Sequence, residues 1–167
     1  ARSDPDFYAA YVANHILGGG GFTSRLTEEV REKRGLAYSV YSYLYPLDFA
    51  PLWVGGLGTA NAAVAQAIQV TRQQIATMAA GSIEQAQLDD AKTYLTGSFP
   101  LRLTSNDSIA STLVNMQVDN LGIDYLDRRN SYIEAVTLED ARRVAARLYR
   151  PEDLLVVVVG EPEGLEG

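Results

Sequence analysis

The chain has 167 residues, of which 47% are hydrophobic and 21% are charged, proportions ordinary for one globular domain with its own core. The formal net charge of −7 argues against a nucleic-acid partner, because binding to phosphates needs a basic face. No apolar run approaches the ~20 residues of a membrane span, and the absence of cysteine excludes disulfides and thiolate sites. We therefore expect residues 1–167 to form a single soluble domain. The compartment stays open, with the bacterial periplasm and the cytoplasm as the expected ones.

The first third of the chain is expected to hold two helices followed by a hairpin. Apolar residues at helical spacing predict a first helix that ends at Gly18. A second helix follows from about Ser24 to Arg34, and Gly35 ends it as a C-cap. Residues 38–45 alternate as a strand, and residues 51–59 pair back on it, with glycines that suggest bulges or a close backbone approach.

The remainder of the chain predicts helices and one closing strand. Ser82 and Thr137 each begin a capping-box pattern, and the expected helices span residues 61–80, 82–98, 105–120, 125–135 and 137–148. The unbroken apolar run Leu154–Val159 predicts a strand buried on both faces. These elements indicate an α+β fold in which helices pack on one face of an antiparallel or mixed β-sheet. Three strands make a thin sheet, which suggests that a strand is missing.

Four consecutive glycines between the first two helices form the first candidate site. Gly18, Gly19, Gly20 and Gly21 precede a helix N-terminus, where backbone N–H groups can hold an anion. Neither a P-loop nor a dinucleotide GxGxxG pattern can be written here. Three interpretations stay open: a flexible connection that allows close packing, contact with a peptide backbone, and phosphate binding.

Arg31 and Tyr38 form the second candidate site, because they lie seven residues apart across the end of the second helix. Such a placement can aim a guanidinium and a phenol at one extended ligand. Pattern alone also allows a solvated surface arginine and an ordinary core or interface tyrosine. Arg25, six residues before Arg31, competes as a structural ion-pair former.

A metal site is not expected in this chain. His15 is the single histidine, whereas the common catalytic zinc sites use two or three histidines. Neither HExxH nor HxxEH can be written anywhere in the sequence. His15 itself is expected at the surface or near the helix dipole, and the acidic pairs at 89–90 and 152–153 are expected to be solvated.

The stretch Ile16–Ser42 closely resembles a motif of the pitrilysin family of zinc peptidases, which includes insulinase-like and mitochondrial-processing-peptidase-like proteins. The similarity continues in the expected order through Gln85–Phe99 and Val136–Pro162, so it covers almost the whole chain. The family is built from homologous α+β domains in pairs. One domain carries HxxEH zinc ligands, and the other lacks zinc and faces it across an enclosed chamber. This chain resembles the second kind.

The resemblance implies a role for each candidate residue. In zinc-free domains of this family an Arg and a Tyr, spaced as Arg31 and Tyr38 are, reach the substrate at the partner domain's zinc. Tyr38 is then the donor to the scissile carbonyl, and Arg31 holds a neighbouring carbonyl of the peptide. The loop Gly18–Gly21 matches the position of the family's glycine-rich loop and is expected to contact substrate, although it is short for specialised presequence recognition.

The resulting hypothesis is the non-metal-binding half of a zinc metalloendopeptidase, which is not catalytic on its own. Its partners are a peptide or unfolded polypeptide substrate and an HxxEH-bearing zinc domain, in the same chain or in a separate subunit. Zinc is expected in that partner and no cofactor in this domain.

Because family domains usually have a strand before the first helix, we expect this chain to be a fragment that lacks that strand. The alternative is a proteolytically inactive structural or assembly subunit of the same fold. An unrelated α+β small-ligand module would require the long motif match to be accidental.

Overall fold

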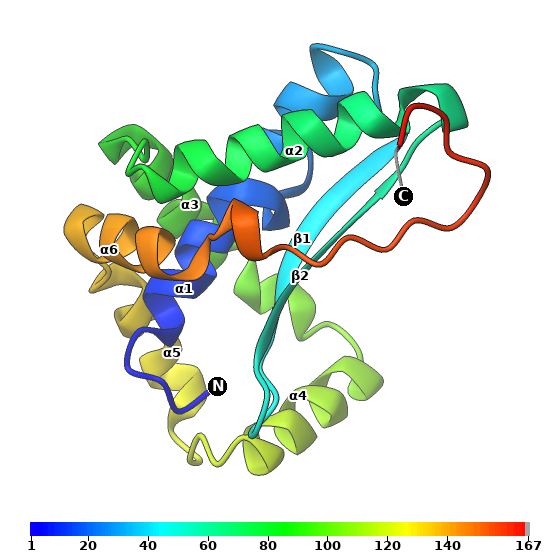
Figure 1. Cartoon of the computed structure of the whole chain (residues 1–167). Coiled ribbons are helices and arrows are strands. Elements are labelled where there is room, and N and C mark those ends of the chain that lie inside the picture. The colour runs from blue at the N-terminus through cyan, green and yellow to red at the C-terminus, as the bar shows by residue number, and fades with distance from the viewer. Residues whose placement is uncertain (166–167) are drawn as a thin grey trace.

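A computed structural model describes residues 1–165, which form six α-helices and one β-hairpin (Figure 1). Short 3₁₀ and π-helical turns connect or extend these elements. In Figure 1 most helices gather on one side of the long hairpin, and α1 runs through the middle of this cluster. The elements are α1 Phe7–Asn14, β1 Ser39–Tyr45, β2 Leu52–Gly58, α2 Val64–Ala79, α3 Gln85–Gly97, α4 Asn106–Val118, α5 Tyr125–Glu134 and α6 Leu138–Leu148. The expected α+β class, with helices on one face of an antiparallel sheet, is confirmed.

The two strands form a regular antiparallel ladder from the pair Ser39↔Gly58 to the pair Tyr45↔Leu52. The expected bulges are therefore wrong, because every residue between these pairs has one partner. The expected close approach is confirmed at Gly56, where an added Cβ would lie 2.8 Å from the Tyr41 hydroxyl oxygen. Strand alternation is as predicted: β1 exposes its three tyrosines, whereas Val40 and Ser42 are buried and Leu44 is partly buried.

The prediction of a closing strand at Leu154–Val159 is wrong. This segment lies beside β2 (Figure 1), across a groove of about 600 Å³, but forms no β-ladder with any strand within residues 1–165. Leu155, Val157 and Val159 are 89%, 77% and 95% exposed. An apolar run predicts burial only if a neighbouring strand is there to cover it, and here the sheet has two strands.

Local signals at helix ends are confirmed in part. Gly35 adopts a left-handed conformation with φ of 61° and ends the second helix, and Thr137 caps α6 together with Asp140. The second helix winds as a π-helix over Thr27–Glu32. The capping box expected at Ser82 is wrong, because Glu84 caps α3 with Gln87 as its reciprocal partner.

A buried polar network joins α1 to the hairpin. Asn14 Nδ2 donates to the Ser42 carbonyl at 3.1 Å, and its Oδ1 accepts from Ser42 Oγ at 2.8 Å and from Trp53 Nε1 at 2.9 Å. One turn later the π-helical segment His15–Gly19 crosses β1 at Gly18, where an added Cβ would lie 2.4 Å from Ser42 Oγ and 2.8 Å from the Ser42 backbone nitrogen. Only glycine allows this crossing, because one of the atoms that a Cβ would meet belongs to the backbone.

We predict that Gly18→Ala destabilises the fold by about 1–3 kcal/mol, because the added methyl overpacks the crossing of helix and strand. Urea unfolding followed by circular dichroism measures the change. Gly97→Ala in α3 is the matched control: its added Cβ meets nothing within 4 Å, so stability is expected to stay unchanged or to rise by up to about 1 kcal/mol. Equal stability of the two variants would contradict the crossing constraint.

Candidate functional site

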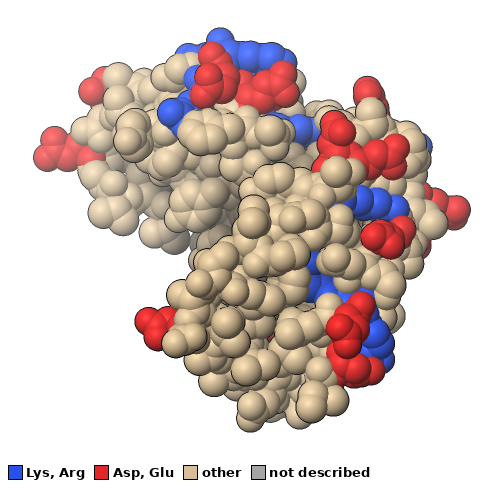
Figure 2. Space-filling view, turned by 180° about the vertical axis from the view of Figure 1, so that it is seen from behind, with Lys and Arg blue, Asp and Glu red and all other residues tan. Residues whose placement is uncertain are grey.

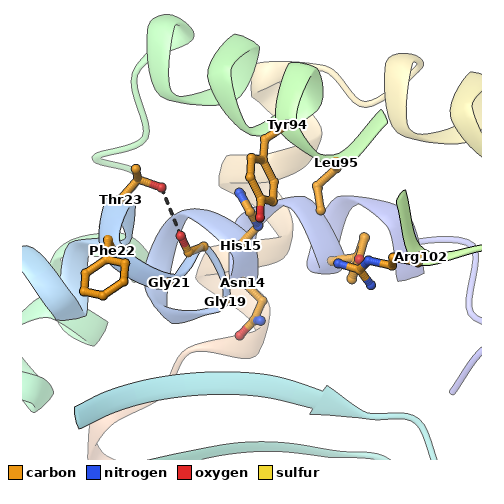
Figure 3. A pocket seen from close by; sticks show the side chains of 11 residues that line it. Asn14, His15, Gly19, Gly21, Phe22, Thr23, Tyr94, Leu95 and Arg102 are labelled. Carbon is orange, nitrogen blue, oxygen red and sulfur yellow. Dashed lines mark hydrogen bonds between the residues drawn. The ribbon is translucent and has the colours of Figure 1, made fainter. Parts of the chain in front are cut away.

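A cavity of about 420 Å³ opens where α1 ends, between the glycine loop and α3 (Figure 3). Its walls come from the end of α1, the loop that follows it, α3 and the 3₁₀ turn Phe99–Arg102. The lining residues are Tyr11, Asn14, His15, Gly19, Gly20, Gly21, Phe22, Thr23, Tyr94, Leu95 and Arg102. The structure thus brings the candidate glycine loop together with α3 and residues near position 100, which are distant in sequence.

The loop is held in shape by its own polar groups. The Gly20 carbonyl accepts from Thr23 N at 3.4 Å and from Thr23 Oγ1 at 3.0 Å, and the Gly21 carbonyl accepts from Ser24 N at 3.2 Å and Ser24 Oγ at 2.9 Å. Gly21 has a φ of 59°, a conformation that favours glycine. Gly18 is buried against β1 and does not line the cavity, so three of the four candidate glycines face it.

His15 is buried, which corrects its expected place at the surface. Its ring stacks on Tyr94 with centroids 5.1 Å apart and planes at 26° (Figure 3). Burial, helped by the positive charge of Arg102, lowers the pKa of His15 below its usual value of 6.5. The imidazole therefore stands in the cavity wall as a neutral group at neutral pH.

Arg31 contacts Phe22, one of the residues that line the cavity. Its guanidinium carbon is 5.2 Å from the centre of the Phe22 ring, a cation–π contact, and its Nε is 3.5 Å from a carboxylate oxygen of Glu32. Its side chain is 37% exposed. Because Phe22 lines the cavity, Arg31 connects the glycine loop to the end of the second helix.

Tyr38 is exposed, which excludes the interpretation as a core aromatic. It precedes β1, its backbone N–H donates to the Gly58 carbonyl at 2.8 Å, and 87% of its surface is accessible. Within residues 1–165 its hydroxyl has no hydrogen-bond partner, and no contact joins it directly to Arg31. Arg31 and Tyr38, although near in sequence, therefore present their polar groups separately: the guanidinium lies against Phe22 and Glu32, and the phenol is exposed.

Arg25 has a structural role. Its Nη1 donates to Ser82 Oγ at 2.6 Å, and its Nη2 donates to the Ser82 carbonyl and, at 2.7 Å, to Gln87 Oε1. These bonds tie the second helix to the start of α3. The hydroxyl of Ser82, expected to cap a helix, serves this contact instead.

Charged side chains elsewhere form small groups of mixed sign. On the face seen in Figure 2 they gather in separate clusters around a broad uncharged area, and no continuous basic area is visible. Over residues 1–165, no group of three or more His, Asp or Glu side chains could hold a metal ion. No helix in that part of the chain has the length and apolar character needed to cross a bilayer.

Comparisons with known proteins agree with this architecture. Residues 1–95 match the family model described as "Peptidase M16 inactive domain". A solved structure of a peptidase M16 inactive domain from Pseudomonas fluorescens is 34% identical, with a TM-score of 0.79 over 90% of this chain and 36% of that one. An uncharacterized zinc protease of Bacillus subtilis, YmxG, is 30% identical over 151 residues, which are 90% of this chain and 37% of that protein.

A third relative differs in its description. The "Non-peptidase homolog YmxG" of Helicobacter pylori is 31% identical over 135 residues, 81% of this chain and 31% of that protein. The chain therefore spans about a third of the length of the curated relatives that it matches.

The buried state of His15 generates a prediction about pH. Because its folded pKa lies below the unfolded value of 6.5, the neutral form stabilises the fold above about pH 6.5, and this stabilisation is lost as the pH falls toward the folded pKa. We predict that the free energy of unfolding in urea is lower at pH 5 than at pH 7.5, and that His15→Gln removes this difference.

Asp6→Asn serves as the control for that measurement. The pKa of Asp6 lies below its usual 3.8, chiefly through the hydrogen bond from Arg143, so its contribution is lost only at lower pH. The variant should keep the decline between pH 7.5 and 5. A decline that persists in His15→Gln would show that another group causes it.

Proposed function

This chain belongs to the peptidase M16 inactive-domain family, and from that premise we propose that it is the zinc-free half of a metalloendopeptidase, where it binds peptide at a partner domain's zinc. The observation that carries the proposal is the contact of Arg31 with Phe22, a residue that lines the glycine cavity, together with the exposed phenol of Tyr38 at the start of the hairpin. Because Tyr38 is 87% exposed, its phenol is accessible to a ligand.

Tyr38 supplies a hydrogen-bond donor in this proposal. Peptide hydrolysis builds negative charge on the scissile carbonyl oxygen, and a phenol that donates to this oxygen stabilises the charge as it develops. The backbone hydrogen bond from Tyr38 to Gly58 fixes the residue at the start of β1, so its side chain projects from a rigid element.

Arg31 supplies ground-state binding. The planar guanidinium offers five N–H donors. The contact with Phe22 holds the guanidinium beside a residue of the glycine cavity, and N–H donors stay available for a ligand. The weak, half-exposed ion pair with Glu32 can be exchanged for peptide carbonyls at little cost. Gly19, Gly20 and Gly21 offer an adjoining surface free of side chains.

Zinc does not fit this chain's own residues. The single histidine, His15, is stacked on Tyr94 and has no carboxylate or second imidazole beside it among the cavity-lining residues within 1–165. In the proposal the zinc belongs to the partner domain, where it supplies Lewis-acid activation of water. This chain holds and polarises the peptide.

An inactive structural or assembly subunit is the second candidate. The description of the Helicobacter pylori relative as a non-peptidase homolog favours it. The two candidates differ in what Tyr38 and Arg31 do: a structural subunit needs neither polar end, whereas a peptidase half needs both.

We predict that Tyr38→Phe lowers kcat by about 10²–10³ in the complete protein with its zinc domain, the scale of a lost oxyanion donor. The ring stays, so the fold should be unaffected. Tyr45→Phe is the matched control, because Tyr45 is also exposed and lies at the other end of β1. Hydrolysis of a fluorogenic peptide measures both, and an unchanged kcat in Tyr38→Phe would remove the proposed donor role.

We predict that Arg31→Ala acts differently, raising KM about tenfold or more with a smaller effect on kcat, because it holds a carbonyl already present in the ground state. Arg25→Ala is the comparison. Since Arg25 bonds to Ser82 and Gln87, its loss should lower the unfolding midpoint while KM stays near that of the unaltered protein. The opposite pattern, with KM sensitive to Arg25 and not to Arg31, would contradict the assignment.

A further inference from the structure

The cavity beside the glycine loop has one charged residue in its wall. Of the eleven residues that line it, Arg102 carries a formal charge at neutral pH, and no aspartate or glutamate is among them within residues 1–165. The chain as a whole carries a net charge of −7. The charge of the cavity wall is therefore opposite in sign to the net charge of the chain. A positive charge in the wall of a cavity favours anionic ligands.

Arg102 is available to a ligand. It ends the 3₁₀ turn Phe99–Arg102 and is exposed. Elsewhere in the described chain arginines pair with carboxylates, as Arg143 pairs with Asp6 at 2.7 Å and Arg34 with Glu29 at 2.6 Å. Within residues 1–165 the Arg102 guanidinium forms no such ion pair and no side-chain hydrogen bond.

The surroundings of Arg102 suit a carboxylate on a peptide. His15 and Tyr94 stack between Arg102 on one side and Phe22 on the other (Figure 3). A neutral imidazole and a phenol offer N–H and O–H donors without adding charge. Phe22 in turn lies under the Arg31 guanidinium, so a peptide that passes Arg31 can extend along the cavity toward Arg102.

We propose that this cavity is a subsite for a carboxylate of the bound peptide, with Arg102 as its ion-pair partner. The inference rests on the proposed function for the path of the peptide. It adds a specificity: a substrate with an acidic side chain, or a free C-terminal carboxylate, near the residue held by Arg31 is preferred to its neutral counterpart.

Binding to the 167-residue chain tests the subsite without using hydrolysis. Three octapeptides serve as probes: one blocked at both ends with a central Glu, the same peptide with Gln, and the Gln peptide with a free C-terminal carboxylate. Dissociation constants come from NMR titration. We expect the Glu peptide, the free-carboxylate peptide or both to bind about five- to tenfold more tightly than the blocked Gln peptide. Which of them does so identifies the source of the carboxylate.

Three arginine variants assign the preference to its residue. Arg102→Gln should abolish it, whereas Arg102→Lys should keep part of it. Arg150→Gln is the matched control, because Arg150 is an exposed arginine paired with Asp153 at 3.5 Å and does not line the cavity; it should keep the preference in full. A preference that is absent, that survives Arg102→Gln or that is lost in Arg150→Gln would overturn the proposal.

His15 provides a second readout, because it is the single histidine and its NMR titration is unambiguous. Burial and, to a lesser extent, the positive charge of Arg102 lower the pKa of His15. A carboxylate bound at Arg102 offsets that charge, so the pKa of His15 should rise with the carboxylate peptide that binds and not with the blocked Gln peptide. Displacement of that carboxylate peptide by an equal concentration of inorganic phosphate would overturn the assignment to a carboxylate. An unchanged kcat in Tyr38→Phe, with carboxylate preference intact, would instead reject the donor role and leave the subsite standing.

Discussion

The crossing of α1 over β1 is the contact on which the site depends. Asn14 uses both ends of its amide there, to the backbone and hydroxyl of Ser42, and it also accepts the Trp53 indole N–H. An unpaired buried amide would cost about 1–3 kcal/mol, so the helix and both strands are held in one relative position. Gly18 completes the contact, because a Cβ at this position would collide with Ser42.

The crossing of α1 over β1 also fixes the position of the glycine loop. The π-helical turn His15–Gly19 follows directly on Asn14, so the same segment that binds the sheet also turns His15 toward Tyr94 and sets the wall of the cavity. The first glycine serves packing, and the next three face the cavity. Of the four consecutive glycines, Gly18 therefore contributes to packing, and the other three contribute to the candidate binding surface.

Electrostatics divides the arginines in a similar way. Arg25 is fixed by hydrogen bonds between elements, Arg31 lies over an aromatic ring with a weak ion pair, and Arg102 is free of ion pairs within residues 1–165. An arginine whose N–H groups are hydrogen-bonded between two elements contributes to the fold. An exposed arginine whose N–H donors have no partner is available to a ligand. The proposed peptide path follows the second and third of these residues.

Much of this protein was determined by local sequence. Gly35, Thr137 and the alternation along β1 act over a few residues, so these two helix ends, the hairpin and its exposed tyrosine face follow from local spacing. The resemblance of Ile16–Ser42 to the family's motif was likewise sufficient to identify the family, and the match of residues 1–95 to the family model confirms it. Tertiary structure decided the rest, because it depends on partners distant in the chain. Within residues 1–165 no strand pairs with Leu154–Val159, so this segment forms no ladder. His15 is buried with its ring stacked on Tyr94. Arg102 lines the same cavity as the glycine loop only once α3 has packed against α1.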